Sequence, residues 1–348
     1  MNILEEIQSC PVEWKELGVV CSVNKGKQLN KNLLIDDGLY PAYNGGQTYS
    51  GRTNDYNVEA NTIIVSQGGA SAGFVNFVET KFWANAHCYY ILPDETQVKN
   101  RFVYHFLKMN QKYLMDFQHG AGIPALKSDK LTKLLIPVAP IKIQEKIVQI
   151  LDKFTDYVTE LTSELTSRKK QYSFYRDKLL SFEDEIYQVE WKALGEVCDV
   201  RDGTHDSPNK KAFGKYLITS KNVKNGSINF DSAYFISESD FDNINKRSNV
   251  DIDDLLFTMI GTVGEVAHIT EEPDFAIKNV GLIKTQSRIL ARYLLHYLQS
   301  TYAKDYILSN SSKGSQVFLG LGKLRNFPIP YVEPKIQSRI VQVLDNFD

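Results

Sequence analysis

The sequence is poor in cysteine, and none of its four cysteines belongs to a C-x-x-C pair of the kind that holds metal ions or forms redox disulfides. Cys21 and Cys198 occupy corresponding positions in two repeated segments, and we interpret them as buried reduced thiols. Long apolar runs are also missing, since none reaches the roughly 18 residues that cross a bilayer, and the N-terminal residues lack a secretory signal pattern. We therefore expect a soluble, cytoplasmic protein with no membrane partner and no metal site.

An excess of charge of one sign is absent as well, because the net charge is −2 and the pI is near 6.3. Proteins that bind nucleic acid over a broad surface are usually strongly basic, so any DNA-binding surface must be local.

Catalytic motifs are also missing. Gly320-Leu321-Gly322-Lys323 is followed by Leu324 where a phosphate-binding loop has Ser or Thr, and the Gly-rich segments 68–73 and 261–264 have the character of turns. We therefore predict a non-catalytic protein that binds no cofactor itself.

What the sequence does contain is an internal repeat. Residues 12–18 (VEWKELG) return as residues 189–195 (VEWKALG), and residues 143–154 (IQEKIVQILDKF) return as residues 336–347 (IQSRIVQVLDNF). The first pair is offset by 177 residues (191 minus 14) and the second by 193 (337 minus 144), so the copies share their ends and differ in the length between them. This pattern predicts one scaffold used twice with different interiors.

Each copy begins with a Glu-x-Lys triplet, at Glu13 and at Glu190, which resembles the end of a nuclease motif. Alternation along a strand would put the tryptophan of the triplet, Trp14 or Trp191, on the face opposite the two charges. A repeated structural strand therefore explains the triplets better than a catalytic site.

Residues 143–182 have the apolar spacing of a long helix, with steps of three and four, charged flanks and no Gly or Pro between Ile141 and Phe182. We predict one uninterrupted helix of about 40 residues, about 60 Å long. Such an apolar seam needs a partner helix, for which the segment 335–347 of the second copy is the candidate. The residues predicted to pack between helices are Ile143, Ile147, Ile150, Phe154, Tyr157, Leu161, Leu165, Tyr172, Tyr175, Leu179, Ile336, Ile340, Val343 and Phe347.

Short runs of β-branched and aromatic residues, broken by Gly and Asn, predict a mixed sheet in each copy. The predicted strands are residues 62–66, 73–78 and 88–92 in the first copy and 255–259, 263–267 and 280–283 in the second. Amphipathic helices are predicted over 101–107 and 292–298, and Pro-containing strands over 135–140 and 327–331. The predicted fold class is α+β, with two mixed α/β domains joined and spaced by long coiled-coil helices. We place the parts at residues 1–140, 141–186, 187–333 and 334–348.

In their order and repetition, these features resemble the specificity (S) subunit of type I restriction-modification systems. The resemblance is carried by the starts at Glu13 and Glu190, by residues 202–208 (DGTHDSP), 219–222 (TSKN) and 168–180 (RKKQYSFYRDKLL), and by Ile-Pro ahead of each Ile-Gln helix start. It implies two target recognition domains, each of which reads one half of a split double-stranded DNA sequence. It also implies two long antiparallel helices that space the domains and dock modification subunits, and through them the restriction subunit. Methylation, with S-adenosylmethionine as cofactor, and cleavage would belong to those partners.

The sequence departs from this family in its second helix, which stops well short of the length of the first. We expect either a shortened gene product or a second S polypeptide that completes the helical bundle.

In the first copy, residues 40–52 mix aromatic, amide and arginine side chains in a turn-rich segment. Amides can pair with adenine, and arginine with guanine, through two hydrogen bonds each in the major groove, although an ordinary hairpin also explains Asn44-Gly45. The candidate DNA contacts are Tyr43, Asn44, Gln47 and Arg52, with Lys127 and Lys130 as candidate phosphate contacts.

In the second copy, residues 202–208 have the composition of a solvent-exposed turn or of a recognition loop whose polar side chains reach base edges and phosphates. The candidate contacts are Thr204, His205, Ser207, Lys210, Lys211, Lys221, Asn222, Lys246 and Arg247. His105 and His296 correspond in the repeat and are interpreted as packed core histidines. The alternative function is a tandem scaffold that binds proteins instead of DNA.

Overall fold

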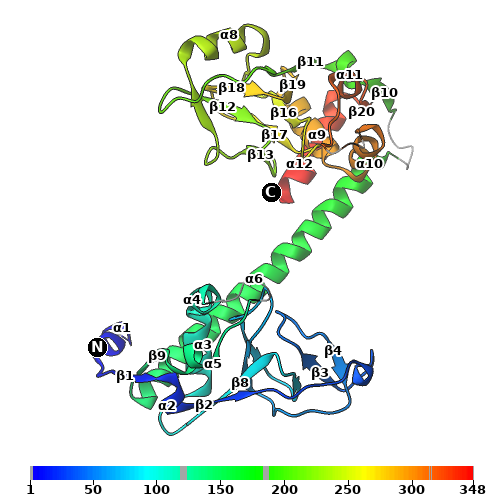
Figure 1. The fold of residues 1–348 in the computed structure, drawn as a ribbon. Helices are drawn as coiled ribbons and strands as arrows, with labels where there is room; N and C mark the ends of the chain where they lie inside the picture. The colour runs from blue at the N-terminus through cyan, green and yellow to red at the C-terminus, as the bar shows by residue number, and fades with distance from the viewer. Residues whose placement is uncertain (1–2, 118–123, 183–187, 313, 315, 348) are drawn as a thin grey trace. The chain divides into compact units, whose positions relative to one another are not determined.

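The computed structural model describes residues 3–117, 124–182, 188–312, 314 and 316–347. These residues form two compact units, Met1–Leu161 and Thr162–Asp348, and the boundary between them falls inside one helix, α6 (Ile141–Ser181) (Figure 1). Helix α6 has 41 residues, which confirms the predicted uninterrupted helix, because nothing in this stretch removes a backbone hydrogen bond. Within the described residues, no helix combines the length and the apolar character that crossing a membrane requires.

Unit 1 contains a four-stranded and a three-stranded sheet. The four strands, in pairing order, are β2 (Cys21–Lys25), β8 (Cys88–Pro93), β5 (Thr62–Ser66) and β6 (Val75–Val78). The three strands are β4 (Gly51–Thr53), β3 (Tyr40–Tyr43) and β7 (Trp83–Ala84), of which β3 and β7 pair in parallel. The helical elements are α1 (Ile3–Ser9), α2 (Leu17–Val20), η1 (Lys31–Leu33), α3 (Asn100–Met109), α4 (Gln111–Asp116) and α5 (Ser128–Thr132).

Unit 2 repeats this arrangement strand for strand. Its four-stranded sheet has the order β11 (Asp199–Asp202), β19 (Val280–Lys284), β16 (Leu255–Thr258) and β17 (Val266–His268). Its three-stranded sheet has the order β15 (Tyr234–Ile236), β12 (Lys215–Thr219) and β18 (Phe275–Lys278), again with one parallel pair, β12 and β18. A two-stranded hairpin, β13 (Val223–Lys224) and β14 (Ser227–Ile228), is added.

The helices of unit 2 extend the correspondence. Helix α9 (Arg288–Leu298) occupies the position of α3, and α12 (Pro334–Leu344) that of the start of α6. The remaining helical elements are α7 (Leu194–Val197), α8 (Glu238–Ser248), α10 (Thr301–Asn310), α11 (Leu321–Arg325) and η2 (Asp345–Phe347). The α+β fold class with a tandem mixed α/β domain is therefore confirmed.

Each unit is closed at its base by a short antiparallel strand pair with the same register. In unit 1, β1 (Glu13–Glu16) pairs with β9 (Leu135–Val138), so that Trp14 faces Pro137. In unit 2, β10 (Glu190–Ala193) pairs with β20 (Pro328–Tyr331), so that Trp191 faces Pro330. Proline can occupy these strands because each strand belongs to a two-stranded sheet and is an edge strand. The strand interpretation of the Glu-x-Lys triplets is confirmed.

The apolar residues of α6 do not all face one partner helix. Some pack on unit 1, some pack on unit 2, and those in the middle of the helix are exposed. Ile147 packs on the core of unit 1 and Ile143 is 6% exposed, whereas Leu179 packs on the core of unit 2. The corresponding α12 residues Ile336 and Ile340 also join the core of unit 2. These five residues were predicted to pack between helices, and all of them lie near an end of a repeat helix, where that helix packs against one of the two units.

Two seam residues do meet the second repeat helix. Ring centroids of Tyr172 and Tyr175 lie 6.3 and 5.6 Å from that of Phe347. Between the two ends of α6 the seam is uncovered, and the exposed fractions are 62% for Phe154, 58% for Tyr157, 63% for Leu161 and 54% for Leu165. Ile150 is half-buried and Val343 is exposed.

Candidate functional site

In each unit, polar loops follow the parallel strand pair of the three-stranded sheet. The carboxyl ends of parallel strands meet at one edge of a sheet, where open α/β sheets place their ligands. In unit 1 the loops after β3 and β7 begin at Asn44 and Asn85, and in unit 2 the loops after β12 and β18 begin at Ser220 and Asn279. The two units therefore present different residues at corresponding edges.

Hydrogen bonds gather the unit 1 loops at this edge. Ser66 Oγ, at the end of β5, donates to the Gly46 carbonyl at 3.0 Å. The Gln67 N–H donates to the His87 carbonyl at 2.8 Å, and the Leu126 N–H donates to the Gln67 carbonyl at 2.7 Å. The predicted residues Asn44, Gln47 and Lys127 thus lie on segments joined at the end of β5, and their side chains are exposed. Lys130 is also exposed, with Nζ 5.2 Å from the Phe117 ring centroid.

Two other predicted residues of unit 1 are engaged within their own sheet. Tyr43 is half-buried and packs edge-on against Phe82 at 5.6 Å, and burial raises its pKa. Arg52 donates through Nε to the Gly38 carbonyl at 2.6 Å and through Nη2 to the Leu39 carbonyl at 2.9 Å. A two-bond contact to guanine through these nitrogens would require both bonds to break, so the structure gives Arg52 a role within the sheet.

In unit 2, a buried carboxylate organises the polar cluster. Asp202 ends β11 and is 6% exposed. It accepts hydrogen bonds from His205 Nε2 at 3.0 Å and from Arg247 Nη2. His205 Nδ1 lies 2.8 Å from Asn279 Oδ1. The His205 and Arg247 side chains are 65% and 66% exposed, so a buried anion holds two exposed nitrogen-rich groups at the surface.

The loop after His205 is fixed to β18. Lys278 Nζ donates to Ser207 Oγ, and Thr204 exchanges backbone hydrogen bonds with both ends of the β18–β19 turn, donating to Ile277 and accepting from Asn279. Asn279 has φ 54, a left-handed conformation that asparagine tolerates. Asp202, Lys278 and Asn279 were not among the predicted contacts. Asn279 carried a signal, because an Asn between two strong strand patterns marks a tight turn.

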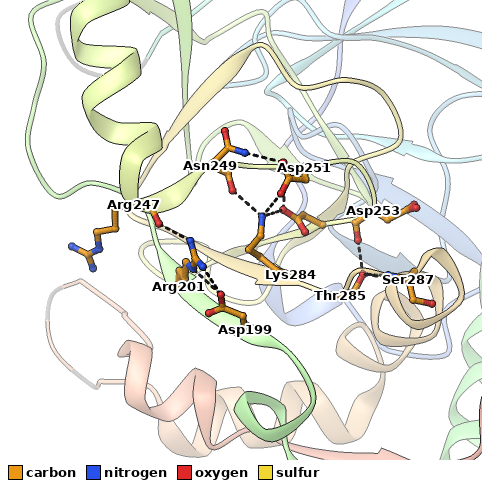
Figure 2. A network of polar contacts seen from close by, with 10 residues as sticks. Asp199, Arg201, Arg247, Asn249, Asp251, Asp253, Lys284, Thr285 and Ser287 are labelled. Carbon is orange, nitrogen blue, oxygen red and sulfur yellow. Dashed lines mark hydrogen bonds and ion pairs between the residues drawn. The ribbon is translucent and has the colours of Figure 1, made fainter.

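A second polar network shares Arg247 with this cluster (Figure 2). Arg201 binds Asp199 at 2.6 Å and donates to the Arg247 carbonyl at 3.1 Å, which ties the end of α8 to β11. Lys284 Nζ contacts Asp251 at 2.6 Å and Asp254 at 2.9 Å. Burial alone would lower the pKa of Lys284, but these hydrogen bonds outweigh it and raise the pKa. Arg247 is thus positioned through its backbone as well as its side chain.

The predicted base contact Asn222 is a structural residue instead. Its side chain is buried, with 1% of the residue exposed. Its Oδ1 accepts from the N–H and the hydroxyl of Thr219, both at 2.9 Å, and its Nδ2 donates to the Asn229 carbonyl at 3.0 Å. The amide shapes the loop after β12 and has no group left to present to DNA.

The lysines of unit 2 among the predicted DNA contacts are exposed. They are Lys210, Lys211, Lys221 and Lys246. Lys210 Nζ lies 4.9 Å from the Tyr234 ring centroid, and Lys246 donates to Asn243 Oδ1 at 2.9 Å. None of these contacts buries the charge, so all four ammonium groups are available to an anion.

A clamp with the same three residue types joins the repeat helix to each unit. Asp152 on α6 binds Arg101 Nη2 at 2.5 Å and His105 Nε2 at 2.7 Å, both on α3. Burial alone would raise the pKa of Asp152, but the hydrogen bonds from Arg101 and His105 outweigh it and lower the pKa.

In unit 2 the clamp is Asp345 with Arg292 at 2.5 Å and His296 at 2.8 Å, and the pKa of Asp345 is lowered in the same way. The prediction that the two histidines are packed residues is confirmed, since His296 is 1% exposed and the His105 side chain 12%.

Two of the cysteines, Cys21 and Cys198, correspond in the repeat. Cys21 and Cys198 are buried, and burial raises the pKa of each thiol to about 12. The four cysteines form no disulfide. Among the described residues, no group of three or more His, Cys, Asp or Glu side chains is arranged to hold a metal ion.

Comparison with known proteins gives one consistent result. A family model described as the type I restriction modification DNA specificity domain matches residues 11–168 and again 188–348. A type I restriction enzyme specificity subunit of Escherichia coli is 27% identical over 371 residues, covering all of this chain and 90% of that protein. A putative specificity subunit of Haemophilus influenzae is 30% identical over 366 residues, covering 98% of this chain and 89% of that protein.

The structural comparison agrees in fold. The crystal structure of a type I restriction-modification S subunit from M. genitalium has a TM-score of 0.68 with 22% identity, and the match covers 97% of this chain and 90% of that one.

Proposed function

This chain belongs to the family of type I restriction-modification specificity subunits, and from that premise we propose that it binds double-stranded DNA and selects a target made of two half-sites. Each unit reads one half-site through the loops at the edge of its three-stranded sheet. Helix α6 joins the two units and sets the number of unread base pairs between the half-sites.

The observation that carries this proposal is the contrast between framework and loops. The two units share strand order, the parallel pair and the register of the base strands. At the corresponding edge, however, unit 1 presents amides and a lysine (Asn44, Gln47 and Lys127), whereas unit 2 presents His205 and Arg247 on a buried carboxylate. Exposed cationic groups bind phosphates and polar groups distinguish base edges, so a shared frame with unlike loops suits the reading of two unlike sequences.

The chemistry of restriction and modification is assigned to other subunits. The chain carries none of the catalytic motifs sought in the sequence, so we propose a non-catalytic subunit that acts in the cytoplasm. A modification subunit that uses S-adenosylmethionine would dock on the helical region, and the restriction subunit would join through it.

The decisive experiment exchanges one unit. Residues 12–140 are replaced by the corresponding segment of a relative with a known target, the variant is expressed with the modification subunit of its own system, and methylated motifs are sequenced. One half-site should change to that of the donor while the other half-site and the spacer remain. The reciprocal exchange of residues 189–333 should change only the other half-site. A change in both half-sites from a single exchange would contradict the assignment.

A tandem protein-binding scaffold is the second candidate, and the near-neutral net charge of −2 favours it. DNA affinity that falls steeply with salt would separate DNA binding from this alternative, because phosphate contacts release counterions.

A further inference from the structure

Arg247 is held differently from the exposed lysines of unit 2. Its Nη2 donates to Asp202, a carboxylate that is 6% exposed, whereas the Arg247 side chain itself is 66% exposed. The Arg247 carbonyl accepts a hydrogen bond from Arg201, and Figure 2 shows the Arg247 side chain pointing away from that contact. The residue is therefore anchored through its backbone and through one nitrogen, while the rest of the guanidinium faces solvent.

The other oxygen of the Asp202 carboxylate is also occupied. His205 Nε2 lies 3.0 Å from Asp202 Oδ2, and His205 Nδ1 lies 2.8 Å from Oδ1 of Asn279, which follows β18. Because both carboxylate oxygens have partners, the plane of the carboxylate is fixed, and with it the direction of the bond to Arg247. A guanidinium held in this way loses little rotamer freedom when it binds a ligand.

The bond to Asp202 leaves most of the guanidinium donors free. Arginine has five N–H donors in a rigid planar fork, and within the described residues Nε and Nη1 of Arg247 have no hydrogen-bond partner. Nη1 and the second hydrogen of Nη2 are two nearly parallel donors. In the major groove, O6 and N7 of guanine are the two acceptors that match such a fork.

The charge of the cluster favours a base over a phosphate as the ligand of Arg247. The Asp202 carboxylate offsets the positive charge of the guanidinium and would repel a phosphate brought close to it. A base edge is neutral and is read by directed donors rather than by net charge. In the described part of the chain, Lys221 and Lys246 contact no carboxylate, since Lys246 Nζ donates to the amide of Asn243 at 2.9 Å. These two lysines therefore suit phosphates, and Arg247 suits a base.

Unit 1 has a different residue at the position of Asp202. Lys25 and Asp202 end the first strands of their four-stranded sheets, β2 and β11. Each is followed by a glycine, Gly26 or Gly203, whose N–H donates at 2.9 Å to the first residue of the paired strand, β8 or β19. Lys25 is exposed where Asp202 is buried. The shared frame thus carries an anion at this position in unit 2 and a cation in unit 1.

We propose that Arg247 reads a guanine in the half-site of unit 2, and that Asp202 is the positioning residue that directs it. Nη1 and Nη2 of Arg247 donate to O6 and N7 of that base, while Asp202 holds Nη2 from the protein side. The inference rests on the proposed function and adds to it one base, the contact that selects this base, and a buried residue that acts through another.

The first test selects targets from duplexes with a randomised unit 2 half-site, using the full chain with the modification subunit. The wild type should require guanine at one position or more. Arg247→Ala should accept all four bases at one of these positions and keep the rest of both half-sites. It should bind the original target about thirtyfold more weakly, as expected for the loss of a two-bond contact.

Lys246→Ala is the matched control, because Lys246 is the neighbouring exposed cation at the end of the same helix. This variant should weaken binding to all duplexes alike and leave every base preference unchanged, as expected for a phosphate contact.

A modified base tests the contact at a single atom. The base 7-deazaguanine keeps its Watson–Crick pairing but lacks the N7 acceptor. At the selected position it should weaken binding of the wild type about fivefold, because one of the two hydrogen bonds is lost. Arg247→Ala should bind the normal and the modified duplex equally, since it makes neither bond.

Asp202→Asn tests the positioning role. The amide has the shape of the carboxylate without its charge, so Arg247 is no longer directed and regains its full positive charge. The preference for guanine should fall several-fold, while the affinity for non-target duplex rises and its salt slope steepens by about 1, because the guanidinium now binds a phosphate. A merely structural loss would weaken binding to all duplexes and leave the slope unchanged. The two Arg247 tests decide the contact whatever the stability of this variant.

Three results would overturn the inference and leave the proposed function standing. The first is a split target in which Arg247→Ala relaxes no position of the unit 2 half-site. The second is relaxation at a position that is not guanine. The third is a uniform loss across all duplexes, which would make Arg247 a phosphate contact. A wild-type chain that selects no split target would instead contradict the proposed function, and the inference with it.

Discussion

At the scale of single residues, the most informative side chains are those that the two units use in the same way. The Arg-His-Asp clamp appears in both, with Asp152 on α6 and Asp345 just after α12. The clamp fixes the start of each repeat helix to α3 or α9, so its removal should loosen this junction rather than the loops at the edge of the three-stranded sheet.

Replacing Asp152 by Asn should destabilise unit 1 by about 1–2 kcal/mol at neutral pH, because hydrogen bonds to a charged group are stronger than neutral ones while partial exposure screens them. The folded-state pKa of Asp152 is lowered. Its contribution is therefore present above the unfolded pKa, about 3.9, and is lost as pH falls through the folded pKa. Urea unfolding at several pH values should show the difference between wild type and variant shrinking in acid. Asp156→Asn, at an exposed position on the same helix, should show no such difference at any pH.

A second prediction compares two neighbouring residues of the loop after β12. Asn222 is buried, whereas Lys221 is exposed. Asn222→Ala leaves the Thr219 N–H and hydroxyl without their acceptor, and should cost about 1–3 kcal/mol of unfolding free energy. Lys221→Ala should leave stability unchanged and, if the lysine contacts a phosphate, should reduce the salt slope of DNA binding by about 1. Denaturation and salt titration of both variants check the pair, and an Asn222→Ala protein of full stability would contradict the structural role.

At the scale of elements, helix α6 contributes residues to both units, and we propose that its length sets the distance between the two half-sites. Its middle residues, including Phe154, Leu161 and Leu165, pack on neither core cluster and are exposed. This stretch can therefore be lengthened without disturbing the packing within either unit.

Four residues inserted between 155 and 161 should lengthen the helix by about 6 Å and, at about 3.4 Å per base pair, should lengthen the preferred spacer by about two base pairs. Binding to a library of targets with different spacers measures the shift. Substitution of four exposed residues in the same stretch, with no change in length, should leave the preference where it was. A preference that stays fixed after the insertion would mean that α6 does not set the spacing.

Helices and strands that are marked by the pattern of their own residues could be predicted from the sequence. The pairing of strands that lie far apart in the sequence could not. The pattern of residues 62–66 identifies β5, and the absence of Gly and Pro between Ile141 and Phe182 identifies α6. The parallel pairs β3 with β7 and β12 with β18 join segments that are about 40 to 60 residues apart, which no local pattern reveals. The apolar spacing of Ile147 could not show that it packs on the core of unit 1 rather than on a second long helix, because both environments select the same periodicity.

The candidate site followed the same division. Residue type drew attention to Asn44, Gln47 and His205, whose side chains are exposed and whose contact with DNA stays a prediction. It could not separate Asn222 and Arg52 from them, because an amide or guanidinium that shapes its own loop has the same composition as one that reads a base. Asp202 was not identified from the sequence. Its role depends on its burial and on its hydrogen bonds with His205 and Arg247, which residue type alone does not reveal.

At the scale of the whole molecule, the two compact units are expected to bind one duplex together. Since the net charge is −2, we expect the affinity for DNA to come from local contacts, for which Lys127, Lys221 and Arg247 are candidates, rather than from the net charge of the whole protein.

The affinity of the chain for duplex DNA should fall steeply with salt, with a slope of about −0.9 for each phosphate neutralised. Fluorescence anisotropy between about 50 and 200 mM salt, with the modification subunit present, measures the slope. A duplex with one altered half-site should bind more weakly at every salt concentration yet keep most of the slope, because its phosphates are unchanged. An affinity that does not depend on salt would favour the protein-binding scaffold.

The strand pairs at the base of the two units have a consequence for how such a protein can change over time. Because Trp14 lies opposite Pro137 and Trp191 opposite Pro330, the chain enters and leaves each unit at neighbouring points. A recombination event can replace all residues between the two strands of such a pair, even by a segment of different length. The strand pair itself is then unchanged. New sequence preferences can thus arise by exchange of a cassette, without any compensating change elsewhere in the polypeptide.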